Sequence, residues 1–426
     1  MLAFVWLVFV AVGLIHFYLW KRLIKDPLRS RRGRRVGAGV TVALALLVPA
    51  TLIGTRTGHA EWLGWPGYLW LALMFYLLVA LISLEIPRAA VLLLWKMQSR
   101  TKESARKETD GSGSITQSDI GGLAARESSA EGAGEDTTDG VDIAAVTTEP
   151  ESEGIERRLV LARGMAIFAG LTAAGITGYG VKTAMGPPRL DRFSMPLAKL
   201  PRAMDGTRLA VVSDIHLGPL TGTRHLGRIV DLINSVQADV VCVVGDLVDG
   251  SVAELGRFAT PLSEIESRYG AFFVTGNHEY YSGFGPWVEE VARLGVRPLR
   301  NERVEINGLD LAGVNDLGGV TYGDGPDFAK ALGDRDPARP VVLMAHQPVA
   351  AHQAAPFGVD LQVSGHTHGG QMAPFNLLVG LQQPVVSGFG KVDGVPVYVT
   401  NGAGFWGPPV RVGAPPQVTV VELRAE

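Results

Sequence analysis

Cysteine is almost absent from this chain of 426 residues, because Cys242 is the only one. It lies in the apolar run 240–244, where we expect a small buried core side chain. A single cysteine excludes an intrachain disulfide bond, so cysteine usage says nothing about the redox compartment. It also excludes a structural zinc site built from several thiolates.

Charged residues are scarce in three early runs, residues 2–20, 36–53 and 67–84. Each run approaches the roughly 20 apolar residues that cross a ~30 Å hydrocarbon core. Tryptophan and tyrosine near their ends favour the membrane interface. We therefore predict a membrane region over residues 1–100 with three transmembrane helices, and we interpret Pro87 and the apolar run 89–95 as a bent or interfacial extension of the third. A soluble helix bundle would need polar faces that these runs lack.

The charge of the loops predicts how these helices are oriented. Residues 21–35 contain eight Lys or Arg and one Asp, whereas residues 54–66 contain one Arg. Short basic loops stay in the cytoplasm. The amino terminus is therefore expected outside, and the chain returns to the cytoplasm after the third helix.

Aromatic residues are absent from residues 108–156, which hold thirteen acidic residues and one arginine. Such a composition cannot offset the entropy of ordering, so residues 101–156 are predicted to form a disordered acidic linker. A second apolar stretch, 159–181, predicts a fourth transmembrane helix or signal-anchor over residues 157–182. Its preceding twin arginines also suggest an export signal, but residues 183–186 make a poor cleavage site. Both interpretations place the rest of the chain on the extracytoplasmic side of the cell membrane.

The pattern changes after a short stiff spacer with prolines at 187, 188 and 196, and residues 200–426 are predicted to form one α/β domain. Strands buried on both faces are expected from apolar runs at 208–212, 239–244, 271–275, 309–314, 340–345 and 359–363. Helices are expected at 223–236, 253–267 and 286–294, and the tail is expected to add hairpin strands. Strands alternating with helices indicate sheets covered by helices.

Histidine is also scarce, and five of the nine histidines fall in short polar blocks. The blocks are Ser213-Asp214-Ile215-His216, Gly245-Asp246, Gly276-Asn277-His278-Glu279, Ala345-His346 and Gly365-His366-Thr367-His368. Each block follows a predicted strand, and the ligand crevice of an α/β sheet lies beyond the carboxyl ends of its strands. We therefore expect the five loops to converge.

The donors in these blocks are oxygen and imidazole nitrogen, which suit Mn, Fe, Co, Ni or Zn ions. Grouping aspartates and histidines without cations would cost several kcal/mol per buried ion. Two divalent ions about 3.5–4 Å apart would polarise a phosphoryl group and activate water for in-line attack. The blocks therefore predict a dinuclear metal centre that hydrolyses a phosphoester.

All five blocks, in this order, resemble those of the calcineurin-like metallophosphoesterases, and residues 365–371 resemble the membrane-associated bacterial phosphodiesterase branch. The similarity covers about residues 205–423. It implies a four-layer sandwich of two mixed β-sheets flanked by helices, and attack by a hydroxide that bridges two metal ions. The implied ligands are Asp214, His216 and His368 for one metal and Asn277, His346 and His366 for the other, with Asp246 bridging them and His278 as the catalytic residue facing the substrate.

A few neighbouring residues leave alternatives open. Asp249 either orients a ligand or is an ordinary loop or helix-cap carboxylate. Gly250 stands where the protein-phosphatase branch has an arginine, which disfavours phosphoprotein substrates. Tyr280 and Tyr281 either line the cleft or pack in the core, and Arg411 is either a phosphate contact or a surface charge. The remaining histidines are expected as solvated or helix-contact residues rather than ligands: His16, His59, His225 on a surface helix, and His352.

The leading hypothesis is a membrane-anchored metallophosphoesterase acting on a phosphodiester, such as a lipid headgroup or a cell-envelope phosphoester. The alternative is a catalytically degenerate membrane sensor or scaffold with a phosphate-binding module, which is disfavoured because every ligand position is filled. A transporter is disfavoured because His16 and Glu85 are the only ionisable candidates in the first three helices. Nothing in the sequence predicts a nucleic-acid partner.

Overall fold

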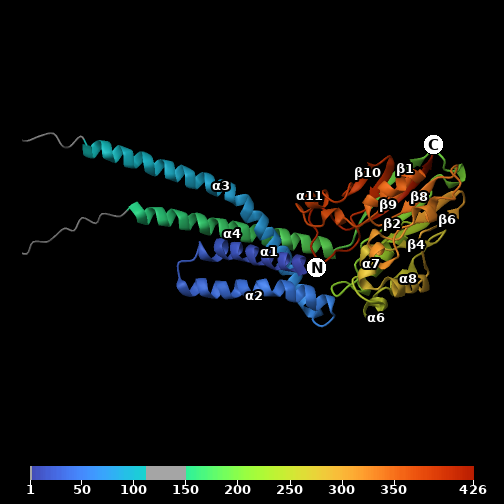
Figure 1. Cartoon of the computed structure of the whole chain (residues 1–426), viewed down its shortest axis with the longest axis horizontal. Coiled ribbons are helices and arrows are strands. Elements are labelled where there is room, and N and C mark those ends of the chain that lie inside the picture. The colour runs from blue at the N-terminus through green and yellow to red at the C-terminus, as the bar shows by residue number, and fades with distance from the viewer. Residues whose placement is uncertain (1, 112–149) are drawn as a thin grey trace, which may run out of the picture.

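The computed structural model describes residues 2–111 and 150–426 (Figure 1). Long helices lie at one end of this described part, and a globular domain of strands and short helices lies at the other. Of the linker predicted over 101–156, residues 112–149 lie outside the described residues.

Four long helices make up the first region. They are α1 Leu2–Trp20, α2 Arg31–Arg56, α3 Gly64–Gly111 and α4 Pro150–Met185, with a π-helical turn Lys21–Lys25 after α1 and a 3-10 turn Glu61–Leu63 before α3. Within the described residues, these four helices are long and apolar enough to cross a membrane. Many of their large apolar side chains, including Trp6, Leu46 and Phe168, are exposed, as they would be against lipid.

Two helix boundaries differ from the sequence expectations. Helix α3 continues through Pro87, in line with the extension interpreted over residues 89–95, but it also runs on to Gly111. Helix α4 begins at Pro150, so helix occupies both described ends of the predicted linker. Residues 96–111 are rich in Lys, Arg and Glu, which favour helix even where little apolar surface is available.

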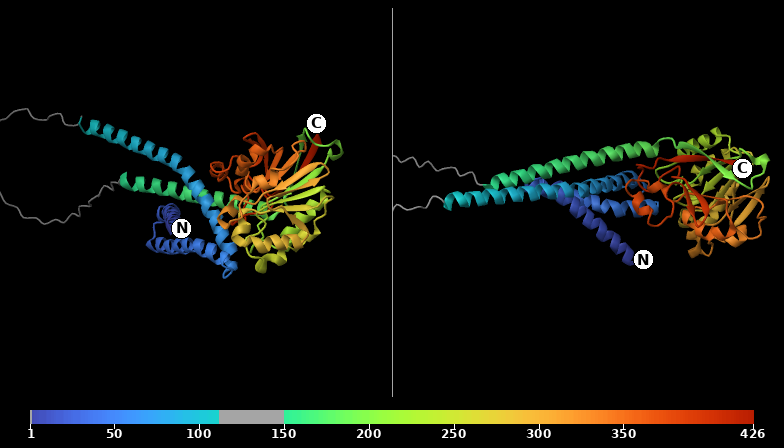
Figure 2. Two further views of the ribbon diagram at one scale, coloured as in Figure 1. Left: turned by 45° about the vertical axis from the view of Figure 1, so that its right-hand side comes forward. Right: turned by 90° about the horizontal axis from the view of Figure 1, so that it is seen from above.

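The connections alternate between the two ends of the helix bundle. The start of α1, the turn between α2 and α3, and the end of α4 lie on the side of the globular domain (Figures 1 and 2). The basic connection between α1 and α2 lies at the opposite end, where α3 and α4 also extend away from the domain.

The globular domain begins earlier than residue 200. Strand β1, Arg189–Leu197, pairs in parallel with β12, Gln417–Ala425, along its whole length. The predicted stiff spacer is therefore a strand. Pro196 is tolerated because β1 lies at the edge of its sheet, where one side needs no hydrogen-bond donors.

The described strands form two mixed six-stranded sheets. The first has the order β1-β12-β2-β3-β4-β5 and the second the order β10-β11-β9-β8-β7-β6. The remaining strands are β2 Arg208–Val212, β3 Val240–Val244, β4 Ala271–Val274, β5 Val296–Pro298, β6 Glu302–Ile306, β7 Leu309–Gly313, β8 Val341–Met344, β9 Leu361–Ser364, β10 Gly388–Val392 and β11 Val395–Val399. The expected tail hairpin is β10–β11, whereas β12 crosses to the first sheet.

Side chains that alternate along each strand separate the domain into layers. Ala210 and Val212 of β2 face a core shared with the helices, whereas Leu209 and Val211 face a core between the two sheets. A third core lies on the outer face of the second sheet. This arrangement confirms the predicted four-layer sandwich.

The covering helices are mostly short. They are α5 Thr223–Ser235, α6 Val252–Leu255, α7 Asn277–Ser282, α8 Phe284–Arg293, α9 Phe328–Leu332, α10 Ala351–Ala354 and α11 Asn376–Val379. The helix expected at 253–267 is replaced by α6 and two 3-10 turns, Gly256–Phe258 and Thr260–Glu264. Gly256 and Pro261 explain the interruption, because both residues disfavour a helix interior.

Candidate metal centre

The five polar blocks meet where neighbouring strands end. Asp214 lies two residues beyond the end of β2, and Asp246 lies two residues beyond the end of β3. In the same way, His346 follows β8 and His366 follows β9. Asn277 begins α7 directly after β4. The parallel strands β2–β4 and β7–β9 bring these loops to one edge of the sandwich, as the spacing predicted.

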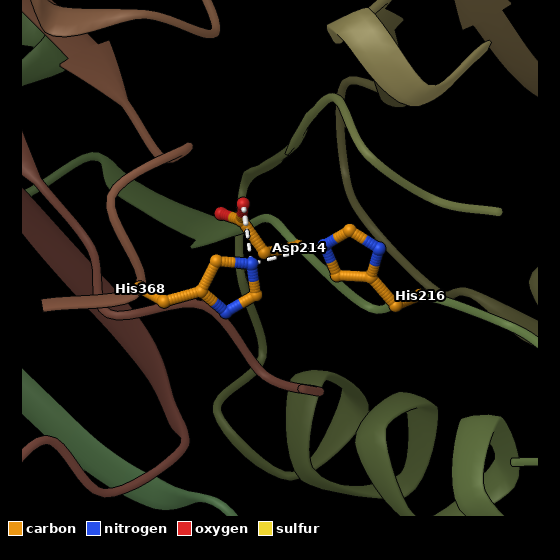
Figure 3. Close-up of side chains that lie close together, drawn as sticks. All are labelled: Asp214, His216 and His368. Carbon is orange, nitrogen blue, oxygen red and sulfur yellow. Dashed lines mark hydrogen bonds and ion pairs between the residues drawn. The ribbon is translucent and has the colours of Figure 1, made fainter. Parts of the chain in front are cut away.

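One cluster consists of Asp214, His216 and His368, whose side chains point toward one another (Figure 3). His368 Nε2 lies 3.3 Å from Asp214 Oδ1 and 2.9 Å from His216 Nε2. A carboxylate and two imidazoles with ligand atoms within 4.8 Å of one another could hold a metal ion.

A second cluster consists of Asp246, His346 and His366, and a third joins Asp246 to His216 and His278. Asp246 Oδ2 lies 3.1 Å from His346 Nε2 and 3.8 Å from His216 Nε2. This carboxylate therefore lies between the two groups of histidines, where two ions could share it.

One polar atom among the predicted ligands is buried without a hydrogen-bond partner, the amide oxygen Asn277 Oδ1. A buried polar atom left without a partner costs about 1–3 kcal/mol, so such an atom usually marks an ion or water that is part of the site. The donor set and this unpaired oxygen together fit divalent metal ions.

Several predicted ligands adopt strained backbone conformations. Asp214, His216, Asp246, His366 and His368 all have positive φ angles, between 49° and 71°. Non-glycine residues rarely adopt this region, and its cost persists only where the surrounding structure enforces it. Positive φ angles at five of the seven predicted ligand positions indicate that the surrounding fold holds these loops in their conformations.

Glu279 holds two of the loops together, a role that sequence reasoning missed. Its fully buried carboxylate accepts hydrogen bonds from the backbone N–H groups of Gly276 at 2.6 Å, Leu247 at 2.7 Å and Asp246 at 3.0 Å. Burial and the nearby Asp246 carboxylate raise the pKa of Glu279. The signal was present in the sequence, because Glu279 ends the Gly-Asn-His-Glu block.

Asp249 orients two histidine rings, which decides between its two predicted roles. Its Oδ1 lies 2.6 Å from His278 Nδ1 and 3.0 Å from His216 Nδ1. Burial alone would raise the pKa of Asp249, but the two rings hold it well below its ordinary value. Burial likewise opposes the charged form of His278, yet Asp246 and Asp249 raise the pKa of His278 to about 9.

Arg411 is fully buried beside the centre, so the surface-charge alternative for it is wrong. Its guanidinium donates to the backbone oxygens of Gly404, His368 and Ala414, and its Nη2 lies 3.0 Å from His368 Nδ1. Burial lowers the pKa of Arg411 to about 9. Its backbone N–H also donates to Gly180 O of helix α4 at 3.0 Å, which links the loop behind His368 to that helix.

The remaining histidines lie away from the three clusters. His225 lies on α5, as expected, but its side chain is buried instead of exposed. The buried His16 ring lies 2.8 Å from Val12 O and accepts a hydrogen bond from Trp70 Nε1. His59 and His352 are exposed, and His352 pairs with Asp393.

Exposed aromatic rings border the centre on the side of the long helices. Tyr281 and Trp406 are more than half exposed, and their rings lie 5.4 and 6.0 Å from the His278 ring. Arg56, the last residue of α2, lies over the Tyr281 ring at 5.9 Å. Tyr280, by contrast, is buried and donates to Asp324, so the two tyrosines divide the two roles predicted for them.

Comparison with known proteins gives a consistent result. The family model described as calcineurin-like phosphoesterase matches residues 207–370. A transmembrane protein with metallophosphoesterase domain from Danio rerio is 37% identical over 61% of this chain and 62% of its own length. A metallophosphoesterase from Aquifex aeolicus is 32% identical over 56% of this chain and 92% of its own length.

Among solved structures, a 5′-nucleotidase precursor from Thermus thermophilus matches with a TM-score of 0.29 at 13% identity, over 51% of this chain and 54% of that one. This likeness is too low to bear on function. The chain spans less than two thirds of the Danio rerio relative, but nearly all of the Aquifex aeolicus protein aligns with it. With its converging blocks and its four-layer sandwich, the chain belongs to the calcineurin-like metallophosphoesterases.

Proposed function

We propose that this protein is a membrane-anchored, metal-dependent phosphoesterase that prefers phosphodiesters. The observation that carries the proposal is the meeting of three donor clusters at Asp246 and His216, next to the buried and unpaired Asn277 Oδ1. A degenerate binding module would not need to keep every donor position filled.

The residues divide between two metal positions. Asp214, His216 and His368 would hold one divalent ion. Asn277, His346 and His366 would hold the other, with Asp246 shared between them. Two bound ions would supply polarisation of the phosphoryl group and a lowered water pKa, and Mn, Fe, Zn, Co or Ni suits these donors.

His278 would act on the substrate. Because Nδ1 donates to Asp249 at 2.6 Å, the other ring nitrogen, Nε2, is directed away from Asp249 and is the position at which the ring gains or loses its proton. A histidine held in this way can stabilise charge on the phosphoryl oxygens or protonate the leaving oxygen. Bound cations would repel the charged form of the His278 ring and would therefore lower its raised pKa toward 7.

The border of the centre favours a substrate at the membrane surface. Arg56 of α2 contacts Tyr281, and a methyl group on Gly407, next to Trp406, would lie 3.6 Å from Tyr68 of α3. The helix ends therefore border the entrance together with the domain. A phosphodiester in a lipid headgroup or another envelope component would lie at this depth. Gly250 stands where the protein-phosphatase branch has an arginine, which disfavours a phosphoprotein substrate.

The enzyme assay uses the full chain in detergent with Mn²⁺. We expect hydrolysis of bis(p-nitrophenyl) phosphate to exceed that of p-nitrophenyl phosphate. His278→Gln and Asp246→Asn should each lower kcat by about 100-fold or more. His352→Gln, which alters an exposed histidine outside the clusters, is the matched control. A folded, metal-loaded protein without activity on either ester would refute the proposal.

A labelling experiment tests the proposed extracytoplasmic location. Cys242 is fully buried, so the native chain gives little background with a thiol reagent. In intact cells, a membrane-impermeant maleimide should label Lys391→Cys in the domain but not Arg32→Cys in the basic first turn of α2. Labelling with the opposite preference would reverse the proposed orientation.

A further inference from the structure

A second candidate site lies at the end of the helix bundle opposite the catalytic domain. A cavity of about 1290 Å³ opens there between the turn after α1, helix α3 and helix α4. Figure 1 shows α3 and α4 diverging toward this end of the bundle. The volume exceeds the roughly 300–1000 Å³ of a typical small-molecule pocket.

The described lining of this cavity is strongly basic. Eight of its residues are Lys or Arg, and Asp26 is the only acidic one. Asp26 is already paired with Arg22 at 3.0 Å. Within the described part of the chain, no carboxylate pairs with Lys21, Lys96 or Arg158. These cations come from separate segments, so the fold concentrates positive charge that the sequence spreads over more than 130 residues.

The same cavity has an apolar wall. Leu92, Leu93 and Trp95 of α3 line one side, and Leu159 and Leu161 of α4 line the other. A soluble phosphate would be attracted by the cations but would gain nothing from these side chains. A ligand that joins a phosphate ester to hydrocarbon chains would match both parts of the lining.

We propose that this cavity binds the headgroup of an anionic phospholipid from the leaflet opposite the catalytic domain. The cavity lies where α1 and α4 pass from their apolar spans into basic sequence, at the depth of lipid phosphates. The cations contact the phosphate, and the leucines contact the upper acyl chains. Because the cavity is lined by both α3 and α4, the bound lipid stabilises their packing.

Binding of phosphatidylglycerol to the full chain in detergent, followed by native mass spectrometry and fluorescent-lipid titration, tests this proposal. The cavity variant is Lys25→Gln, Lys96→Gln and Arg158→Gln combined. The matched control is Arg31→Gln, Arg32→Gln and Arg35→Gln, which removes three exposed charges from the same basic region outside the cavity lining. We expect the cavity variant to lose about tenfold or more in affinity and the control to lose little.

Three outcomes would overturn the proposal. Equal losses in both triple variants would show general surface attraction, and equal affinity for phosphatidylcholine would show an uncharged apolar groove. Full competition by millimolar inorganic phosphate would show a soluble-anion site. Helicity and thermal unfolding of both variants establish that they are folded. Hydrolysis of bis(p-nitrophenyl) phosphate is measured separately, so failure of the proposed phosphodiesterase activity would leave the lipid-binding result unaffected.

Discussion

Replacement of Arg411 tests how the centre is supported from behind. Arg411→Met keeps an unbranched side chain and removes every guanidinium donor. Gly404, His368 and Ala414 would then lose the hydrogen bonds that their backbone oxygens receive from Arg411. At about 1.5–3 kcal/mol for each bond to a charged group, the loss is roughly 4–9 kcal/mol.

Burial of the guanidinium offsets part of this loss. A pKa of about 9 in place of the ordinary 12.5 corresponds to roughly 5 kcal/mol of unfavourable desolvation, which methionine would not incur. The difference runs from about −1 to 4 kcal/mol, and the middle of this range leaves Arg411→Met destabilised by about 2 kcal/mol. For a domain of this size, the unfolding temperature should fall by roughly 4–8 °C.

Arg411→Lys gives the sharper test. Lysine keeps the charge and its desolvation cost, but its ammonium cannot reproduce the planar fork that reaches carbonyl oxygens on several sides. We therefore expect Arg411→Lys to be at least as unstable as Arg411→Met. If the charge alone mattered, the lysine variant would be the more stable of the two.

The assay is thermal unfolding of the full chain, followed by tryptophan fluorescence, together with a Mn²⁺ titration of phosphodiester hydrolysis. Both variants should need more Mn²⁺ than the wild type, because Arg411 contacts His368. Arg224→Met, on the exposed face of α5, is the control. Wild-type stability and Mn²⁺ requirement in both Arg411 variants would refute the reasoning.

Three further predictions follow from the same geometry. Asp249→Asn removes the charge that orients two rings, so Mn²⁺ affinity in an activity titration should fall by about 10–100-fold, whereas the exposed Asp231→Asn should leave it unchanged. Burial, with Arg228 and Arg411, lowers the pKa of His225 to about 4, so between about pH 6.5 and pH 4 the unfolded chain binds a proton that the folded chain does not, and the free energy of unfolding falls as the pH drops. Between pH 7.5 and pH 5 this loss of stability is about 2 kcal/mol. In pH-dependent melts, His225→Leu should lack the loss that His225 causes. An equal loss in both proteins would contradict that assignment. Chelation should lower the unfolding temperature and Mn²⁺ should restore it, because one site at 100 times its Kd adds about 2.7 kcal/mol to the free energy of unfolding. Asp246→Asn should show a much smaller response in the same melts.

The strands and the polar blocks could be predicted because both depend on local sequence. The apolar run 240–244 suits a strand buried on both faces, and β3 occupies Val240–Val244. Asp246 follows that strand closely, so its place at the sheet edge follows from the direction of the chain. The start of the domain was missed because β1 is stabilised by pairing with β12, more than 220 residues away.

The amino-acid sequence by itself determined the helix-forming apolar runs, the strands and the donors that follow them, because each depends on residues close together in the chain. Only the tertiary structure decided the environment of Arg411, which depends on contacts with His368 and with Gly180 of α4. The same holds for the Glu279 carboxylate between two loops and for the basic cavity between three helical segments. Charge and polarity are properties of a residue, but burial and pairing are set by distant segments that the fold brings together.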